Sequence, residues 1–81
     1  MTGVLVLDGA LLPEALTAAG DEDVIVVDPS AARLEQFERE ARDPRVAYLI
    51  GDAQVLPLPD ASVERAFGEG DEAELARVLA R

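Results

Sequence analysis

Hydrophobic residues gather in three short runs, and longer amphipathic segments separate these runs from one another. The runs are Gly3–Leu7, Val24–Asp28 and Val46–Ile50, and branched apolar residues dominate each of them. Continuous apolar runs of this length, bounded by turn-forming residues, are typical of strands that are buried on both faces of a parallel sheet. We therefore predict three strands, of which Val24–Asp28 is central.

The segments between these runs have the pattern of helices. Leu11–Ala19 carries Pro13 in its first turn and is followed by Gly20, which suits the end of a helix. The next segment starts at Ser30, a capping residue, and its apolar residues recur at three- and four-residue spacing up to about Ala41. Each predicted helix thus connects two predicted strands.

The remainder of the chain is less regular. Gln54–Ser62 contains two prolines and reads as a loop, Val63–Phe67 is a short, weak strand, and a last helix begins at Asp71. Strands that alternate with helices predict a single α/β domain over residues 1–81, with three layers and right-handed crossovers.

Composition excludes several classes of function. The 81 residues include no cysteine, histidine or lysine, which excludes disulfides, thiolate zinc sites, Cys–His nucleophiles and Schiff bases. The net charge of −10 disfavours nucleic acid as a direct partner. No apolar run approaches the length of about 20 residues that spans a bilayer. No basic segment typical of a signal peptide opens the sequence, so we expect a cytoplasmic protein without membrane contact.

An aspartate lies at or just after the end of each of the three apolar runs. Asp8, Asp28 and Asp52 would lie on one edge of a parallel sheet, at the crevice where such sheets bind ligands. One interpretation is that each aspartate only caps a turn. The other is that the three form a site, with Gly9 and Gly51 beside two of them, for a ligand that carries hydroxyl or ammonium donors.

The spacing between Gly9 and Asp28 adds a weak signal for a nucleoside. Asp28 follows Gly9 by 19 residues, close to the spacing between a glycine-bearing first turn and the acid that binds ribose hydroxyls. A complete G-x-G-x-x-G motif is missing, so the sequence gives little support to a nicotinamide dinucleotide enzyme.

Two longer stretches carry a resemblance to a known family. VIVVDPSAARLEQFERE and RVAYLIGDAQVLPLPDASVERAFG resemble the N-terminal half of class I S-adenosylmethionine-dependent methyltransferases, and the final ELARVLAR is similar to a later helix. The resemblance implies a Rossmann-like, mostly parallel sheet of about four strands in the order 3-2-1-4, with S-adenosylmethionine as the cofactor. It also implies that Asp28 binds the ribose hydroxyls, that the Asp52 side chain meets the adenine amine, and that the Ala53 N–H meets an adenine ring nitrogen.

The chain departs from the family at the first turn, where VLVLDGALL replaces a glycine-rich motif. In one alignment Asp8 takes the place of a glycine, and its carboxylate would face and repel the carboxylate on the methionine part of the cofactor. In the other, Asp8 is the acid of the first strand and Gly9 is the turn glycine. The family's later strands are missing from this sequence, so we name no catalytic residue and expect the isolated chain to be inactive.

These observations leave two function hypotheses. The first is a methyltransferase-like domain that binds S-adenosylmethionine at Asp8, Gly9, Asp28, Asp52 and Ala53. The second is a non-enzymatic interaction or regulatory domain that kept the fold and lost the cofactor. In either case we expect a homodimer through the edge of the fourth strand, Val63–Phe67, because an open strand edge invites pairing. Phe67, Leu75 and Leu79 are the apolar residues that we expect such a dimer to cover.

Overall fold

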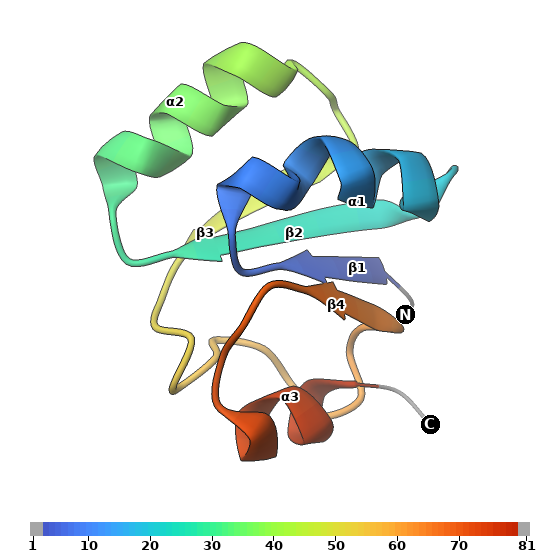
Figure 1. Cartoon of the computed structure of the whole chain (residues 1–81), viewed down its shortest axis with the longest axis vertical. Helices are drawn as coiled ribbons and strands as arrows, with labels where there is room; N and C mark the ends of the chain where they lie inside the picture. Colours follow the sequence, from blue (N-terminus) through green and yellow to red (C-terminus); the bar gives the residue numbers. More distant parts are fainter. Residues whose placement is uncertain (1–2, 80–81) are drawn as a thin grey trace.

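Four parallel strands form the centre of the structure, a computed structural model that describes residues 3–79 (Figure 1). The strands are β1 (Gly3–Val6), β2 (Asp23–Asp28), β3 (Val46–Ile50) and β4 (Arg65–Phe67), in the order β3-β2-β1-β4. Every neighbouring pair of these strands is parallel. The α/β class, the Rossmann-like sheet and the 3-2-1-4 order are thereby confirmed.

The helices follow the predicted alternation. A short 3-10 helix η1 (Gly9–Leu11) leads into α1 (Leu12–Ala19), and α2 (Ala31–Ala41) and α3 (Glu72–Val78) come later. Four boundaries differ by one or two residues from the prediction: β1 ends at Val6, α1 begins at Leu12, β2 begins at Asp23, and β4 begins at Arg65 rather than at Val63. Val63 instead forms a parallel bridge with Leu79, and its N–H donates to the Val78 carbonyl over 3.0 Å.

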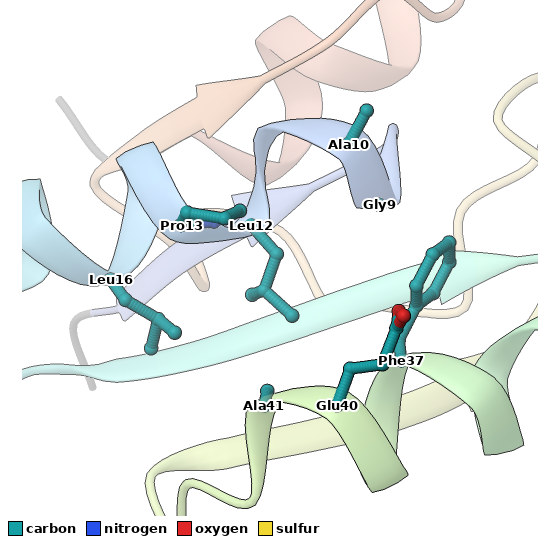
Figure 2. A pocket seen from close by; sticks show the side chains of 8 residues that line it. All are labelled: Gly9, Ala10, Leu12, Pro13, Leu16, Phe37, Glu40 and Ala41. Atoms are coloured by element: carbon teal, nitrogen blue, oxygen red, sulfur yellow. The ribbon is translucent and has the colours of Figure 1, made fainter.

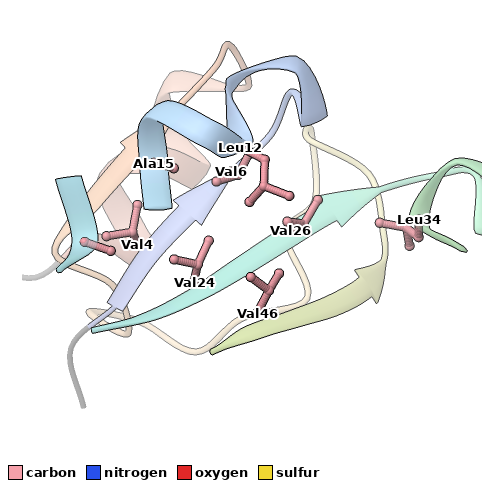
Figure 3. Close-up of a cluster of buried hydrophobic side chains, with 9 residues drawn as sticks. Val4, Val6, Leu12, Ala15, Val24, Val26, Leu34 and Val46 are labelled. Atoms are coloured by element: carbon pink, nitrogen blue, oxygen red, sulfur yellow. The ribbon is translucent and has the colours of Figure 1, made fainter. Parts of the chain in front are cut away.

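Both faces of β1 are buried, as its uninterrupted apolar sequence predicts. Val4 and Val6 belong to the larger hydrophobic cluster, which α1 and α2 cover (Figure 3). Leu5 belongs to a second cluster on the other face, together with Leu56 and Val78. All three β1 side chains are fully inaccessible to solvent. Helices α1 and α2 thus form one layer, the sheet a second, and the 51–62 loop with α3 the third.

The loop that covers the second face is held by Arg77 of α3. Its guanidinium donates to the carbonyl oxygens of Leu58, at 2.7 Å, and Leu56, at 3.0 Å. It also pairs with Glu74, at 2.8 Å, and with Asp60, at 2.9 Å. These bonds satisfy backbone carbonyls of the loop, so a proline-rich segment can pack as a layer.

Glu74 contributes to the same attachment. Asp71 caps α3 by accepting from the Glu74 N–H at 3.0 Å, whereas the Glu74 side chain accepts from the Leu56 N–H at 2.8 Å. Arg77 and then the Leu56 N–H stabilise the carboxylate, so the pKa of Glu74 lies below its ordinary value of 4.5.

The apolar residues that we expect a dimer to cover already have contacts within their own chain. Phe67, Leu75 and Leu79 are partly buried against the two hydrophobic clusters of their own chain. The large hydrophobic residues that stand exposed are Ile50, at 64%, and Val55, at 71%, both near the end of β3. Within residues 3–79, none of the helices combines the length and the apolar character that a bilayer crossing demands.

Replacement of Arg77 by Met should lower the melting temperature, because the loop carbonyls and Glu74 lose their donor. The ion pair stabilises the fold above pH 4.5 and is lost as the pH falls and Glu74 is protonated. The difference in melting temperature between wild type and Arg77→Met should therefore shrink in acid. Melting curves from circular dichroism over a pH series measure this, with the exposed Arg39→Met as the control. An equal loss in both variants would contradict the role of Arg77.

Candidate functional site

The parallel sheet brings three of the predicted site residues to one edge. Asp28 is the last residue of β2, and Asp8 and Asp52 each follow the final residue of their strand by two positions. Because β1, β2 and β3 are parallel, all three carboxylates lie at the carboxyl edge of the sheet. This is the edge where open α/β sheets bind ligands.

Asp28 is the buried member of the three. The residue is 2% exposed, and its carboxylate oxygens have separate partners. Oδ1 accepts from the Ser30 N–H at 2.8 Å, and Oδ2 accepts from Nη2 of Arg33 at 2.9 Å. A buried carboxylate needs such partners because it has lost its hydration. Asp28 therefore fixes both the turn into α2 and the position of the Arg33 side chain.

Asp8 is exposed and works first as a cap. Its Oδ1 accepts from the Ala10 N–H at 3.0 Å, at the start of η1. Asp8 also lines a pocket together with Leu7, Leu11, Arg33, Gly68 and Glu69, which we call the edge pocket. The capping interpretation and the ligand interpretation of this aspartate are thus compatible, because a carboxylate can accept several hydrogen bonds.

The edge pocket has a volume of about 520 Å³ and lies between the ends of β1 and β4. The strand order reverses between these two strands, since the chain adds β2 and β3 on one side of β1 and β4 on the other. Such a topological switch point is the usual ligand crevice of this architecture. Gly68, with φ of +105°, lets the chain pass so close to Asp8 that a Cβ would lie 3.1 Å from its backbone nitrogen.

Asp52 and Ala53 form a separate turn at the same edge. Asp52 Oδ1 accepts from the Gln54 N–H at 2.8 Å, and the Ala53 carbonyl accepts from the Asp71 N–H at 3.2 Å. Among residues 3–79 the Ala53 N–H donates to no acceptor. Neither residue lines the edge pocket, so the structure brings Asp8 and Arg33 together there and keeps Asp52 and Ala53 apart.

Gly9 lies on the other side of η1. It borders an apolar groove of about 350 Å³ between η1, α1 and α2, which we call the helix groove (Figure 2). The groove is lined by Gly9, Ala10, Leu12, Pro13, Leu16, Phe37, Glu40 and Ala41. A Cβ on Gly9 would collide with the Phe37 ring, so this position needs glycine for the packing of α2 against η1.

Two charged residues of the edge pocket, Arg33 and Glu69, were not among the predicted site residues. Arg33 carries a signal that sequence reasoning could have used. It is the third residue of α2, where a cation opposes the helix dipole. A residue that breaks a local rule often has a specific partner, and here that partner is Asp28. Glu69 gives no such signal, because it follows a short strand at the surface.

Charged groups of both signs line the edge pocket. Two carboxylates, Asp8 and Glu69, and one guanidinium, Arg33, surround a space that Leu7 and Leu11 line with apolar atoms. Within residues 3–79 no three histidine, cysteine, aspartate or glutamate side chains are grouped so as to hold a metal ion. The arrangement suits a ligand with hydroxyl, ammonium and carboxylate groups.

Comparison with known proteins gives one match to a family model, described as "Methyltransferase domain", at residues 7–68. The matched region runs from the end of β1 to the glycine after β4, and it contains all five predicted site residues. No curated protein matches the chain.

Replacement of Gly9 by Ala should destabilise the fold by about 1–3 kcal/mol, the range for overpacking a filled site. The added methyl group displaces the Phe37 ring. Urea unfolding measures the free energy of unfolding of Gly9→Ala, Phe37→Leu and the double variant. Because leucine at position 37 makes room for the added methyl group, the double variant should lose less stability than the two single variants together. If Gly9→Ala left stability unchanged and weakened ligand binding, Gly9 would serve ligand approach instead.

Proposed function

The chain belongs to the class I S-adenosylmethionine-dependent methyltransferase family, and we propose that it is a domain that binds S-adenosylmethionine at the carboxyl edge of its sheet. One observation carries the proposal. The edge pocket lies at the switch point between β1 and β4, and buried Asp28 lies at the end of the neighbouring strand β2. This is the arrangement expected for a nucleoside-containing ligand.

The described residues fit the cofactor in kind. Asp28 would accept from the ribose hydroxyls, and Asp52 and the unpaired Ala53 N–H would recognise adenine. The carboxylates of Asp8 and Glu69 suit the ammonium group at the amino-acid end of the cofactor. An edge pocket of about 520 Å³ lies within the range of about 300–1,000 Å³ that is common for small-ligand sites.

Asp8 has two roles in this proposal, as the cap of η1 and as a neighbour of the amino-acid end. A carboxylate there would attract the ammonium group of the cofactor and repel its carboxylate. We propose binding rather than turnover by residues 3–79 alone and assign no catalytic residue. When bound, the cofactor supplies an activated methyl group, whereas the chain's own residues bind and orient it.

Asp28→Asn should weaken the binding of S-adenosylhomocysteine, because the ribose hydroxyls lose a charged acceptor. The expected loss is about 1.5–3 kcal/mol, a rise in Kd of roughly 10- to 150-fold. Isothermal titration calorimetry measures it, with Asp23→Asn as the control. Asp23 is an exposed aspartate at the opposite end of the same strand.

Melting curves establish that both variants are folded before titration. Binding that Asp28→Asn leaves intact would refute the role of Asp28. An absence of binding by folded wild type would refute the proposed function.

A second candidate, a homodimeric interaction domain without the cofactor, is favoured by the outer edge of β4. Within residues 3–79, β4 pairs with β1 alone, and the bridge to Leu79 protects only Val63 before the strand. Unpaired N–H and C=O groups on such an edge can pair with a second copy. A small domain of this kind has a marginal core, so an interface of roughly 800 Å² per partner would stabilise it.

Light scattering after size exclusion should then give twice the mass of one chain. Phe67 also packs against a hydrophobic cluster of its own chain, so melting curves first establish that Phe67→Asp, at the end of β4, is folded; the folded variant should then have the mass of one chain. Ile50→Asp places the same charge on β3, the opposite edge strand, and should leave the dimer intact. A wild-type mass of one chain at micromolar concentration would refute the dimer. Dissociation by Ile50→Asp alone would move the interface to β3.

A further inference from the structure

Arg33 connects the edge pocket to Asp28. Its side chain lines that pocket, while its Nη2 atom lies 2.9 Å from Oδ2 of Asp28. The Asp28 side chain is only 3% exposed and does not line the pocket, whereas the Arg33 side chain is 64% exposed. A ligand in the edge pocket therefore meets the guanidinium before it meets the carboxylate.

Both oxygens of Asp28 are engaged, but the two bonds differ in how easily they open. The bond from the Ser30 N–H to Oδ1 is part of the backbone turn that leads into α2. The bond from Arg33 to Oδ2 comes from a long, mostly exposed side chain that can adopt other rotamers. Arg33 is thus the partner that can leave without a change in the fold.

We propose that Arg33 is a cover over Asp28 that the ribose diol of a nucleoside ligand must displace. The inference rests on the proposed function and adds a residue that sets the affinity of the same site. In the free protein Arg33 supplies one hydrogen bond, to Oδ2, and the positive charge that buried Asp28 needs. In the complex the ribose hydroxyls donate to Asp28 in place of Arg33, the bond from the Ser30 N–H is kept, and the guanidinium moves into solvent.

The cover predicts an unusual dependence on salt. Added salt screens the exposed side of an ion pair and makes the cover easier to displace. Adenosine is a suitable probe because it is uncharged and has the ribose diol without the amino-acid end. The affinity of the wild type for adenosine should therefore rise with the sodium chloride concentration. If Arg33 instead bound the ligand directly through its charge, the affinity would fall as salt is added.

The test is calorimetric titration of adenosine into wild type, Arg33→Met and Arg39→Met, at low and at high sodium chloride. Arg39 is an exposed arginine of the same helix, and its replacement removes the same charge. The Arg33 end of the ion pair is exposed to solvent, which limits the free energy needed to displace it, so Arg33→Met should lower Kd by about fivefold. Arg39→Met should change Kd by less than about twofold, and the gain with salt should vanish in Arg33→Met alone.

A second measurement on the wild type does not depend on whether Arg33→Met folds. An ion pair slows rotation of the guanidinium, so the Arg33 Nη signals should be resolved by nitrogen-15 NMR in the free protein. Saturation with adenosine should merge them. Arg33 signals that stay unchanged at saturation would overturn the cover.

The outcomes separate this inference from the proposed function. Unchanged or weaker binding of adenosine by folded Arg33→Met would overturn the cover and leave the proposed function in place. S-adenosylhomocysteine is titrated alongside. Failure of both ligands to bind wild type and Arg33→Met would overturn the proposed function, and the cover with it.

Discussion

The position of β1 between β2 and β4 is the constraint on which the rest of the structure depends. Its side chains are buried on both faces, so each face requires its own cover, α1 and α2 on one side and the 51–62 loop with α3 on the other. Because both neighbours run parallel to β1, every strand ends at the same edge. Asp8, Asp28 and Asp52 therefore lie along that edge as a consequence of topology.

Burial at that edge explains the chemistry of the site. Asp28 ends a strand that is buried on both faces, so its carboxylate is withdrawn from water and needs partners within the chain. The Ser30 N–H and Arg33 meet this need. A structural requirement thereby places an exposed cation beside the edge pocket. Under the proposed function the same carboxylate would also accept from the ligand, so stability and binding would compete for one side chain.

The sequence predicts the parts of this picture that depend on local patterns. Apolar runs predicted the strands, and alternation with helices predicted a parallel sheet that gathers Asp8, Asp28 and Asp52. Side-chain partners were harder to predict, because the pairing of Arg33 with Asp28 depends on a rotamer and on burial. The packing of Phe37 onto Gly9 and the pairing of Val63 with Leu79 depend on how distant segments meet. The spacing of apolar residues along the chain does not predict contacts between distant segments. The position of Arg33 in the first turn of α2, where a cation is unfavourable, does indicate that this residue has a specific partner.

The most direct test of the central claim, that the carboxyl edge of the sheet is the binding site, is an amide NMR titration with S-adenosylhomocysteine. The account predicts chemical-shift changes centred on Asp8, Asp28 and Ser30, on Ala53, and on Gly68 beside the edge pocket. Changes confined to the helix groove, at Leu16, Glu40 and Ala41, would contradict it. A spectrum that does not change at saturating ligand would contradict it as well.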